Sequence, residues 1–188
     1  MPTAVPDAMS HEDVPEVDAL LQSAVREVET HAAGGGWDQP ARLYALVPTA
    51  DLLEREPRLA AAMGLDEVSS AGSLTPVEQD QLPEDRTLEQ VLETIMWPPD
   101  VFGCAAVVER FVLPPGADEQ VPEDPGHAQE YAASHPDRQE VRIAAGATRD
   151  GSTYCALRLK SHDDDLSVIE STDLVPALLQ LLSGTLEN

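Results

Sequence analysis

The sequence of 188 residues predicts an α+β fold: a single domain over residues 14–188 with an about four-stranded, largely antiparallel sheet packed against helices. The length allows one domain with a substantial core. Residues 140–160 alternate between apolar and polar like a β-hairpin, and other segments repeat apolar residues every three or four positions, as amphipathic helices do. Residues 1–13 contain two prolines and few apolar residues, so we expect a mobile N-terminal arm there.

The hairpin pattern is specific enough to predict a register. A three-residue loop at 149–151, with Gly151 at positive φ, pairs residues whose numbers sum to 300. One face is then apolar and contains Val141, Ile143, Ala145, Cys155, Leu157 and Leu159. The other face pairs Glu140 with Lys160, Arg142 with Arg158, and Gly146 with Tyr154. A two-residue loop at 150–151 would mix the two faces, so we favour the longer loop.

The N-terminal half predicts three helices and one strand. Apolar residues recur from Val14 to Val28 at helical spacing, and the glycines at 34–36 end that helix. Residues 42–47 are apolar on both faces, which indicates an interior strand. Thr49 is expected to cap a short helix through Leu53, and Pro57 to open another that reaches Met63.

The rest of the chain alternates long polar segments with apolar elements. Residues 65–86 lack a sustained period and are predicted to be the longest loop, with one helical turn near Pro76 as an option. A capping box at Thr87 and Gln90 opens a helix. We expect the longest, central strand at residues 102–113, followed by an acidic, mobile loop at 114–126. A short helix is expected at residues 127–134, and Pro176 is expected in the first turn of the last helix.

Composition limits the classes of partner. The net charge of -24 repels nucleic-acid phosphates and anionic membranes, so we expect no nucleic acid and no membrane as partner, and a protein with a basic surface instead. Solubility alone is an alternative explanation of the charge. The sequence shows no signal peptide and no long apolar run, and we expect a cytoplasmic protein. The oligomeric state stays open, with a homodimer as one option.

No motif indicates a metal site, a cofactor site or a catalytic residue. We expect the protein to bind no metal and no cofactor. Residues 34–37, GGGW, lack the strand, the following helix and the Lys-Ser or Lys-Thr pair of a phosphate loop. Asp163, Asp164 and Asp165 do not have the alternate spacing of a calcium loop, which favours a solvated turn. Cys104 and Cys155 lie in apolar strands, where we expect buried free thiols.

The polar face of the hairpin supplies the candidate interaction surface, which contains Arg142, Arg158, Tyr154 and Lys160. Two arginines facing each other repel unless a carboxylate lies near them. Glu109 is the expected partner if the long strand adjoins the hairpin. Tyr154 is expected to cover Gly146.

Four segments carry a resemblance to a family. They are GWDQPARLYALVPT at residues 36–49, HPDRQEVRIAAG at 135–146, YCALRLKSHDDD at 154–165 and DLVPALL at 173–179. With them the chain resembles an uncharacterised actinobacterial family of small acidic cytoplasmic proteins. The resemblance implies no catalytic residue, cofactor or partner.

These observations favour an acidic protein-binding module, an adaptor or chaperone-like protein without a catalytic signature. An enzyme with an acidic pocket near Asp51, Glu109 or the aspartate turn is one alternative. A nucleic-acid mimic that binds a basic partner is another.

Overall fold

The computed structural model of the chain describes residues 18–68, 72–113 and 120–187, and the arm expected at residues 1–13 lies outside them. The fold is α+β, with one antiparallel sheet in the order β2-β1-β3-β4-β5-β6. The strands are β1 (Arg42–Pro48), β2 (Leu74–Glu78), β3 (Gly103–Val112), β4 (Gln139–Thr148), β5 (Thr153–Leu159) and β6 (Ile169–Ser171). The helices are α1 (Ala19–Ala33), α2 (Thr49–Arg55), α3 (Pro57–Ala62), α4 (Leu88–Leu92), α5 (Pro125–Ser134) and α6 (Pro176–Gly184).

The predicted hairpin is confirmed in register and in loop. Val141 lies opposite Leu159 and Arg142 opposite Arg158, as the sum of 300 requires. Gly151 has φ +89°, in the region that glycine adopts without strain, and its amide donates to the Thr148 carbonyl at 3.1 Å. The hairpin therefore sorts its side chains onto two faces, as the alternation predicted.

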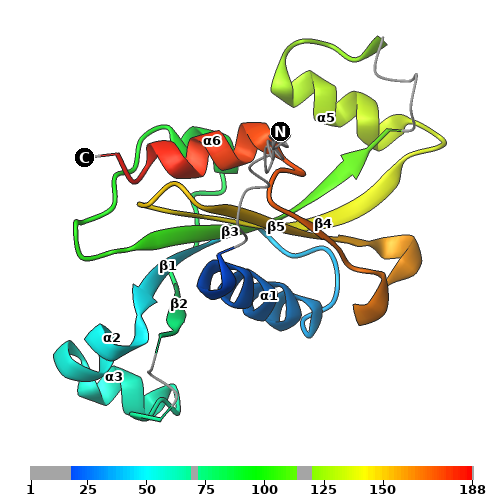
Figure 1. The fold of residues 1–188 in the computed structure, drawn as a ribbon. Helices are drawn as coiled ribbons and strands as arrows, with labels where there is room; N and C mark the ends of the chain where they lie inside the picture. Colours follow the sequence, from blue (N-terminus) through cyan, green and yellow to red (C-terminus); the bar gives the residue numbers. More distant parts are fainter. Residues whose placement is uncertain (1–17, 69–71, 114–119, 188) are drawn as a thin grey trace, which may run out of the picture.

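Helices cover both faces of the sheet, with α1 on one side and α6 on the other (Figure 1). The apolar hairpin face packs with α4, α6 and the buried Trp97 in one core. The opposite face packs against α1 in a second core, in which β3, β4 and β5 contribute the small residues Ala105, Ala144 and Ala156. These small side chains allow α1 to approach the sheet closely.

At Gly146, α1 lies so close to the sheet that there is no room for a side chain. A Cβ at this position would lie 2.8 Å from Val25 Cγ2 and 3.0 Å from Leu21 Cδ1. The prediction that Tyr154 covers this glycine is corrected here, since the nearest side chains above it belong to α1. Tyr154 is buried in the same core, and its hydroxyl accepts a hydrogen bond from Gln22 at 2.9 Å.

The described residues form six strands where about four were predicted, and β2 is one of the two that were missed. It lies within residues 65–86, which were predicted to be a loop. Two hydrogen bonds flank its ladder with β1, from Gln79 N to Leu43 O at 2.9 Å and from Thr49 N to Ser73 O at 3.0 Å. Because inward and outward positions alternate, Pro76 falls where an amide would point away from β1. Proline is tolerated at this position on an edge strand.

The other missed strand, β6, has three residues and pairs with β5 at the opposite edge. Thr49 also differs from its expected role as a helix cap. It lies inside α2, and its hydroxyl hydrogen-bonds the Thr75 hydroxyl at 2.7 Å, joining the start of α2 to β2. Thr49 is therefore a strand-to-helix anchor.

The remaining predicted elements are confirmed with small shifts. Asp18 caps α1, which ends before Gly34 as predicted, while the predicted start of this helix at Val14 lies outside the described residues. Thr87 and Gln90 form the predicted capping box of α4, and Pro57 opens α3. The predicted helix at 127–134 starts two residues earlier, because Asp124 caps it by accepting the amide hydrogen of His127. No helix in the described part of the chain combines the length and apolar character that a membrane crossing needs.

Candidate functional site

A buried ion pair joins α1 to the hairpin. Arg158 on β5 is 3% exposed and donates from Nε to Glu29 Oε1 at 2.5 Å and from Nη2 to Glu29 Oε2 at 3.2 Å. Glu29 lies on the sheet-facing side of α1 and is itself buried. The hydrogen bond to Glu29 holds the pKa of Arg158 above its ordinary value, although burial offsets part of this shift. The two-pronged geometry fixes both side chains.

The same guanidinium also holds the aspartate turn that follows β5. Arg158 donates to Asp163 Oδ1 at 3.2 Å and to Asp165 Oδ1 at 2.6 Å. The turn was predicted to be solvated, and both carboxylates are indeed exposed, but each also reaches back to a buried cation. The hydrogen bond from Trp37 Nε1 to Asp163 Oδ2, at 2.9 Å, lowers the pKa of Asp163, with a smaller contribution from Arg158. Asp163 therefore joins the hairpin to the loop that follows α1.

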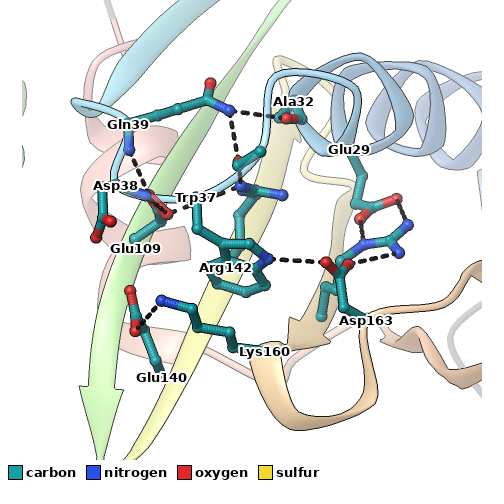
Figure 2. A network of polar contacts seen from close by, with 12 residues as sticks. Glu29, Ala32, Trp37, Asp38, Gln39, Glu109, Glu140, Arg142, Lys160 and Asp163 are labelled. Atoms are coloured by element: carbon teal, nitrogen blue, oxygen red, sulfur yellow. Dashed lines mark hydrogen bonds and ion pairs between the residues drawn. The ribbon is translucent and has the colours of Figure 1, made fainter.

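Arg142, opposite Arg158, is 1% exposed and lies under the Trp37 ring, 4.4 Å from the guanidinium carbon to the ring centroid. Its Nη2 donates to the Gly36 carbonyl and lies 3.7 Å from Glu109 Oε1. Glu109 was the predicted partner, and the pairing of β3 with β4 places it directly across from Arg142. Figure 2 shows how Arg142, Trp37 and Glu109 gather beside Glu29 and Asp163, the two carboxylates that Arg158 contacts.

The side chain of Glu109 holds the loop between α1 and β1 by binding backbone amides of that loop. Its two carboxylate oxygens accept the amide hydrogens of Asp38 and Gln39, both at 2.8 Å (Figure 2). Asp38 has φ +63°, a conformation that non-glycine residues rarely adopt and that these bonds help to hold. Gln39 in turn donates to the carbonyl of Ala32, the penultimate residue of α1, at 3.0 Å. These bonds fix the glycine-rich loop to the sheet, so that Trp37 in this loop covers Arg142.

Lys160 closes the network on its exposed side. Its ammonium donates to Glu140 Oε2 at 2.9 Å, the pair that the hairpin register predicted, and lies 5.7 Å from the centroid of the Trp37 ring. The hydrogen bond to Glu140 raises the pKa of Lys160. Trp37 therefore has two cations near its ring and a carboxylate at its indole nitrogen.

The network around Arg158 fixes the surface turn that carries Leu166. Ser167 donates through its hydroxyl to Asp164 Oδ2 at 2.8 Å and through its amide to the Asp164 carbonyl at 3.2 Å. Arg158 holds Asp165 on the other side. Leu166 stands between these anchors in a short 3-10 turn and is 100% exposed. An apolar side chain is therefore displayed on an ordered, acidic turn.

The four residues of the predicted interaction surface differ in their exposure to solvent. Arg142, Arg158 and Tyr154 are buried beneath α1 and the glycine-rich loop, while Lys160 is partly exposed. The acidic positions considered for an enzyme pocket also separate. Glu109 and the aspartate turn share the network just described, whereas Asp51 lies in the first turn of α2.

Two residues of the network were not assigned a role from the sequence. Glu29 follows Val25 by four residues and Leu21 by eight, which puts it on the buried stripe of α1. A carboxylate at such a position requires a buried cation. Trp37 carried no comparable signal, since its role depends on the loop folding back over Arg142.

The cysteines are confirmed as buried free thiols. Burial raises the pKa of Cys104 to about 11, partly offset by a hydrogen bond with Thr185. A thiol with this pKa is protonated at neutral pH and is a poor nucleophile. Among the described residues, no group of three or more His, Cys, Asp or Glu side chains is arranged to hold a metal ion.

Comparison with known proteins adds a family. No curated protein and no solved structure matches the chain. A family model described as PPA1309-like protein matches residues 21–187, a range that runs from the first buried residue of α1 to just beyond α6. This match is consistent with the resemblance to an actinobacterial family seen in the sequence. The chain belongs to the PPA1309-like protein family.

Proposed function

We propose that this protein is an acidic protein-binding module, an adaptor or chaperone-like protein, that uses the aspartate turn to dock on a basic protein surface. The observation that carries the proposal is the display of Leu166 on a turn that a buried arginine holds from inside. A single exposed leucine is common on protein surfaces. An exposed leucine on a fixed turn loses less conformational freedom when a partner binds, which favours affinity.

The charges around Leu166 favour a basic partner. Three consecutive aspartates precede it, and Ile169, also exposed, follows shortly after. Seven of the eleven basic side chains are paired with carboxylates of the chain itself: Arg26, Arg42, Arg55, Arg110, Arg142, Arg158 and Lys160. Few basic side chains therefore remain to balance the excess carboxylates. The field of these carboxylates attracts a basic surface from a distance.

The expected contribution of Leu166 follows from its area. Burying a fully exposed leucine stabilises a complex by about 1.5–3 kcal/mol. Its loss should weaken binding by roughly ten- to a hundredfold. The aspartates should act mainly on the association rate, because rim charges steer the encounter more than they hold the complex.

The test is capture from native lysate with four tagged proteins: the wild type, Leu166→Ser, Asp164→Asn and Met96→Ser. Met96 is also exposed (67%) but follows α4, whose core lies on the other face of the sheet, so Met96→Ser is the matched control. We expect a protein with a basic surface to be retained by the wild type and by Met96→Ser, and to be lost with Leu166→Ser. Retention that is equal for all four proteins contradicts the proposal.

A further inference from the structure

A groove of about 390 Å³ lies on the side of α1 away from the aspartate turn. Its apolar lining is formed by Val28 of α1, Met63 after α3, and Pro76 of β2. Figure 1 shows that α1 lies beside the β1–β2 end of the sheet, the elements that supply most of this lining. Its volume is within the range of small-molecule sites.

A buried hydroxyl without a partner lies in the lining of this groove. Tyr44 on β1 is 4% exposed, and among the described residues its hydroxyl has no hydrogen-bond partner. Burial raises the pKa of Tyr44, while the nearby Arg42 offsets part of the shift without reaching hydrogen-bond geometry. A buried hydroxyl without a partner destabilises the fold, because it loses its hydrogen bonds to water without replacing them. Such a group is typical of a site that binds a ligand rather than of the core.

The polar lining is acidic. Glu27 and His31 come from successive turns of α1, and Glu78 lies directly across from Tyr44 in the pairing of β1 with β2. Glu78 lies 3.7 Å from Arg42, at the outer side of the groove. Although Glu27 reaches solvent, the surrounding protein raises the pKa of its carboxyl by desolvation, which His31 partly offsets. A cation brought to this carboxylate would restore the solvation that it loses.

We propose that this groove binds a small organic cation, a primary amine carried on an apolar chain or ring. The ammonium group pairs with Glu27 and donates a hydrogen bond to the Tyr44 oxygen, and Glu78 adds a second negative charge. The apolar part of the ligand contacts Val28 and Met63. A carboxylate ligand would be repelled by Glu27, and a neutral alcohol would leave the Glu27 carboxylate without a cation. The site is independent of the aspartate turn, which lies on the other side of α1.

The experiment uses three probes with the same six-carbon chain length: hexylamine, which is positively charged, 1-hexanol, which is neutral, and hexanoate, which is negatively charged. Each is titrated into the full-length protein and followed by amide chemical shifts. We expect hexylamine to bind with a Kd on the order of 1 mM, given its seven heavy atoms, and to move the resonances of α1 and β2 at the groove. We expect 1-hexanol and hexanoate to bind more weakly.

Three variants separate a ligand-binding role from a structural one. Tyr44→Phe should weaken hexylamine binding about fivefold, and Glu27→Gln about tenfold or more, because the lost bond is to a charged group. Glu54→Gln makes the same charge change on the exposed face of α2 and should leave binding unchanged. The free Tyr44→Phe protein should melt at the wild-type temperature or above it, because the removed hydroxyl has no partner in the fold.

Three results would overturn the proposal. The first is hexanoate or 1-hexanol binding as tightly as hexylamine. The second is shifts spread over the acidic surface that Tyr44→Phe and Glu27→Gln leave unchanged, which indicates unspecific attraction to the net charge. The third is a marked loss of stability in free Tyr44→Phe, which would show that the hydroxyl serves the fold.

Discussion

Replacing Arg158 with methionine tests the buried network that holds the aspartate turn. The change leaves the Glu29 carboxylate inside the protein without the cation that contacts both of its oxygens. Breaking a buried ion pair from one side costs about 3–5 kcal/mol. In a protein of this length 1 kcal/mol corresponds to roughly 2–4 °C, so the melting temperature should fall by about 6–20 °C.

The assay is urea and thermal denaturation, followed by circular dichroism, of Arg158→Met, Glu29→Leu and the double variant. Removing both charges leaves no unpaired ion, so the double variant should recover most of the stability that Arg158→Met loses. A loss below about 1 kcal/mol in Arg158→Met, or a double variant no more stable than Arg158→Met, would refute the reasoning. The first outcome would mean that water solvates Glu29, and the second that packing dominates.

Three further predictions concern the hairpin loop, the thiols and the turn. Gly151→Val forces a β-branched residue to φ +89° and should destabilise by more than about 1 kcal/mol, so an unchanged urea midpoint would argue against the three-residue loop. Cys104 and Cys155 should react slowly with a thiol reagent in the native protein and fast in denaturant, and rapid native labelling would contradict their burial. Because the fold lowers the pKa of Asp163, its ionised form stabilises the protein above the unfolded value near 4, and this contribution is lost as the pH falls through the folded pKa. Trp37 fluorescence should change below a pH of about 4 and Trp37→Phe should abolish the change, whereas a signal unaffected by Trp37→Phe would assign it to Trp97.

Local patterns in the sequence were sufficient for the central strands and most helices. The hairpin register followed from one glycine and from alternation, because a shift by one residue would move every apolar side chain to the other face. That register, with the long strand placed beside it, also identified Glu109 as the partner of Arg142. Here, short-range rules determine a contact between residues far apart in the sequence.

The two edge strands could not be predicted in the same way. In β2, Pro76 looks like a strand breaker until its outward position on the edge is known. The three residues of β6 are too few to show an alternating period. Both strands depend on the sheet edge that they extend, which is a tertiary feature.

The candidate site shows the same division between local pattern and tertiary contact. Spacing alone could have placed Glu29 on the buried stripe of α1, but its pairing with Arg158 requires α1 to lie across β5. Tyr154 was expected at the surface because it lies on the polar face of the hairpin, whereas α1 covers that face at Gly146. Which face of the sheet a helix covers decides whether a polar strand residue is exposed.

The most direct test of the proposed function is the association rate with the captured partner, measured by surface plasmon resonance at about 0.05 and 0.5 M sodium chloride. Wild-type protein should associate much faster at low salt, because the charge of -24 is then less screened. Leu166→Ser should keep that salt dependence and dissociate at least about tenfold faster. An association rate indifferent to salt, together with a dissociation rate that Leu166→Ser leaves unchanged, would contradict binding through the aspartate turn.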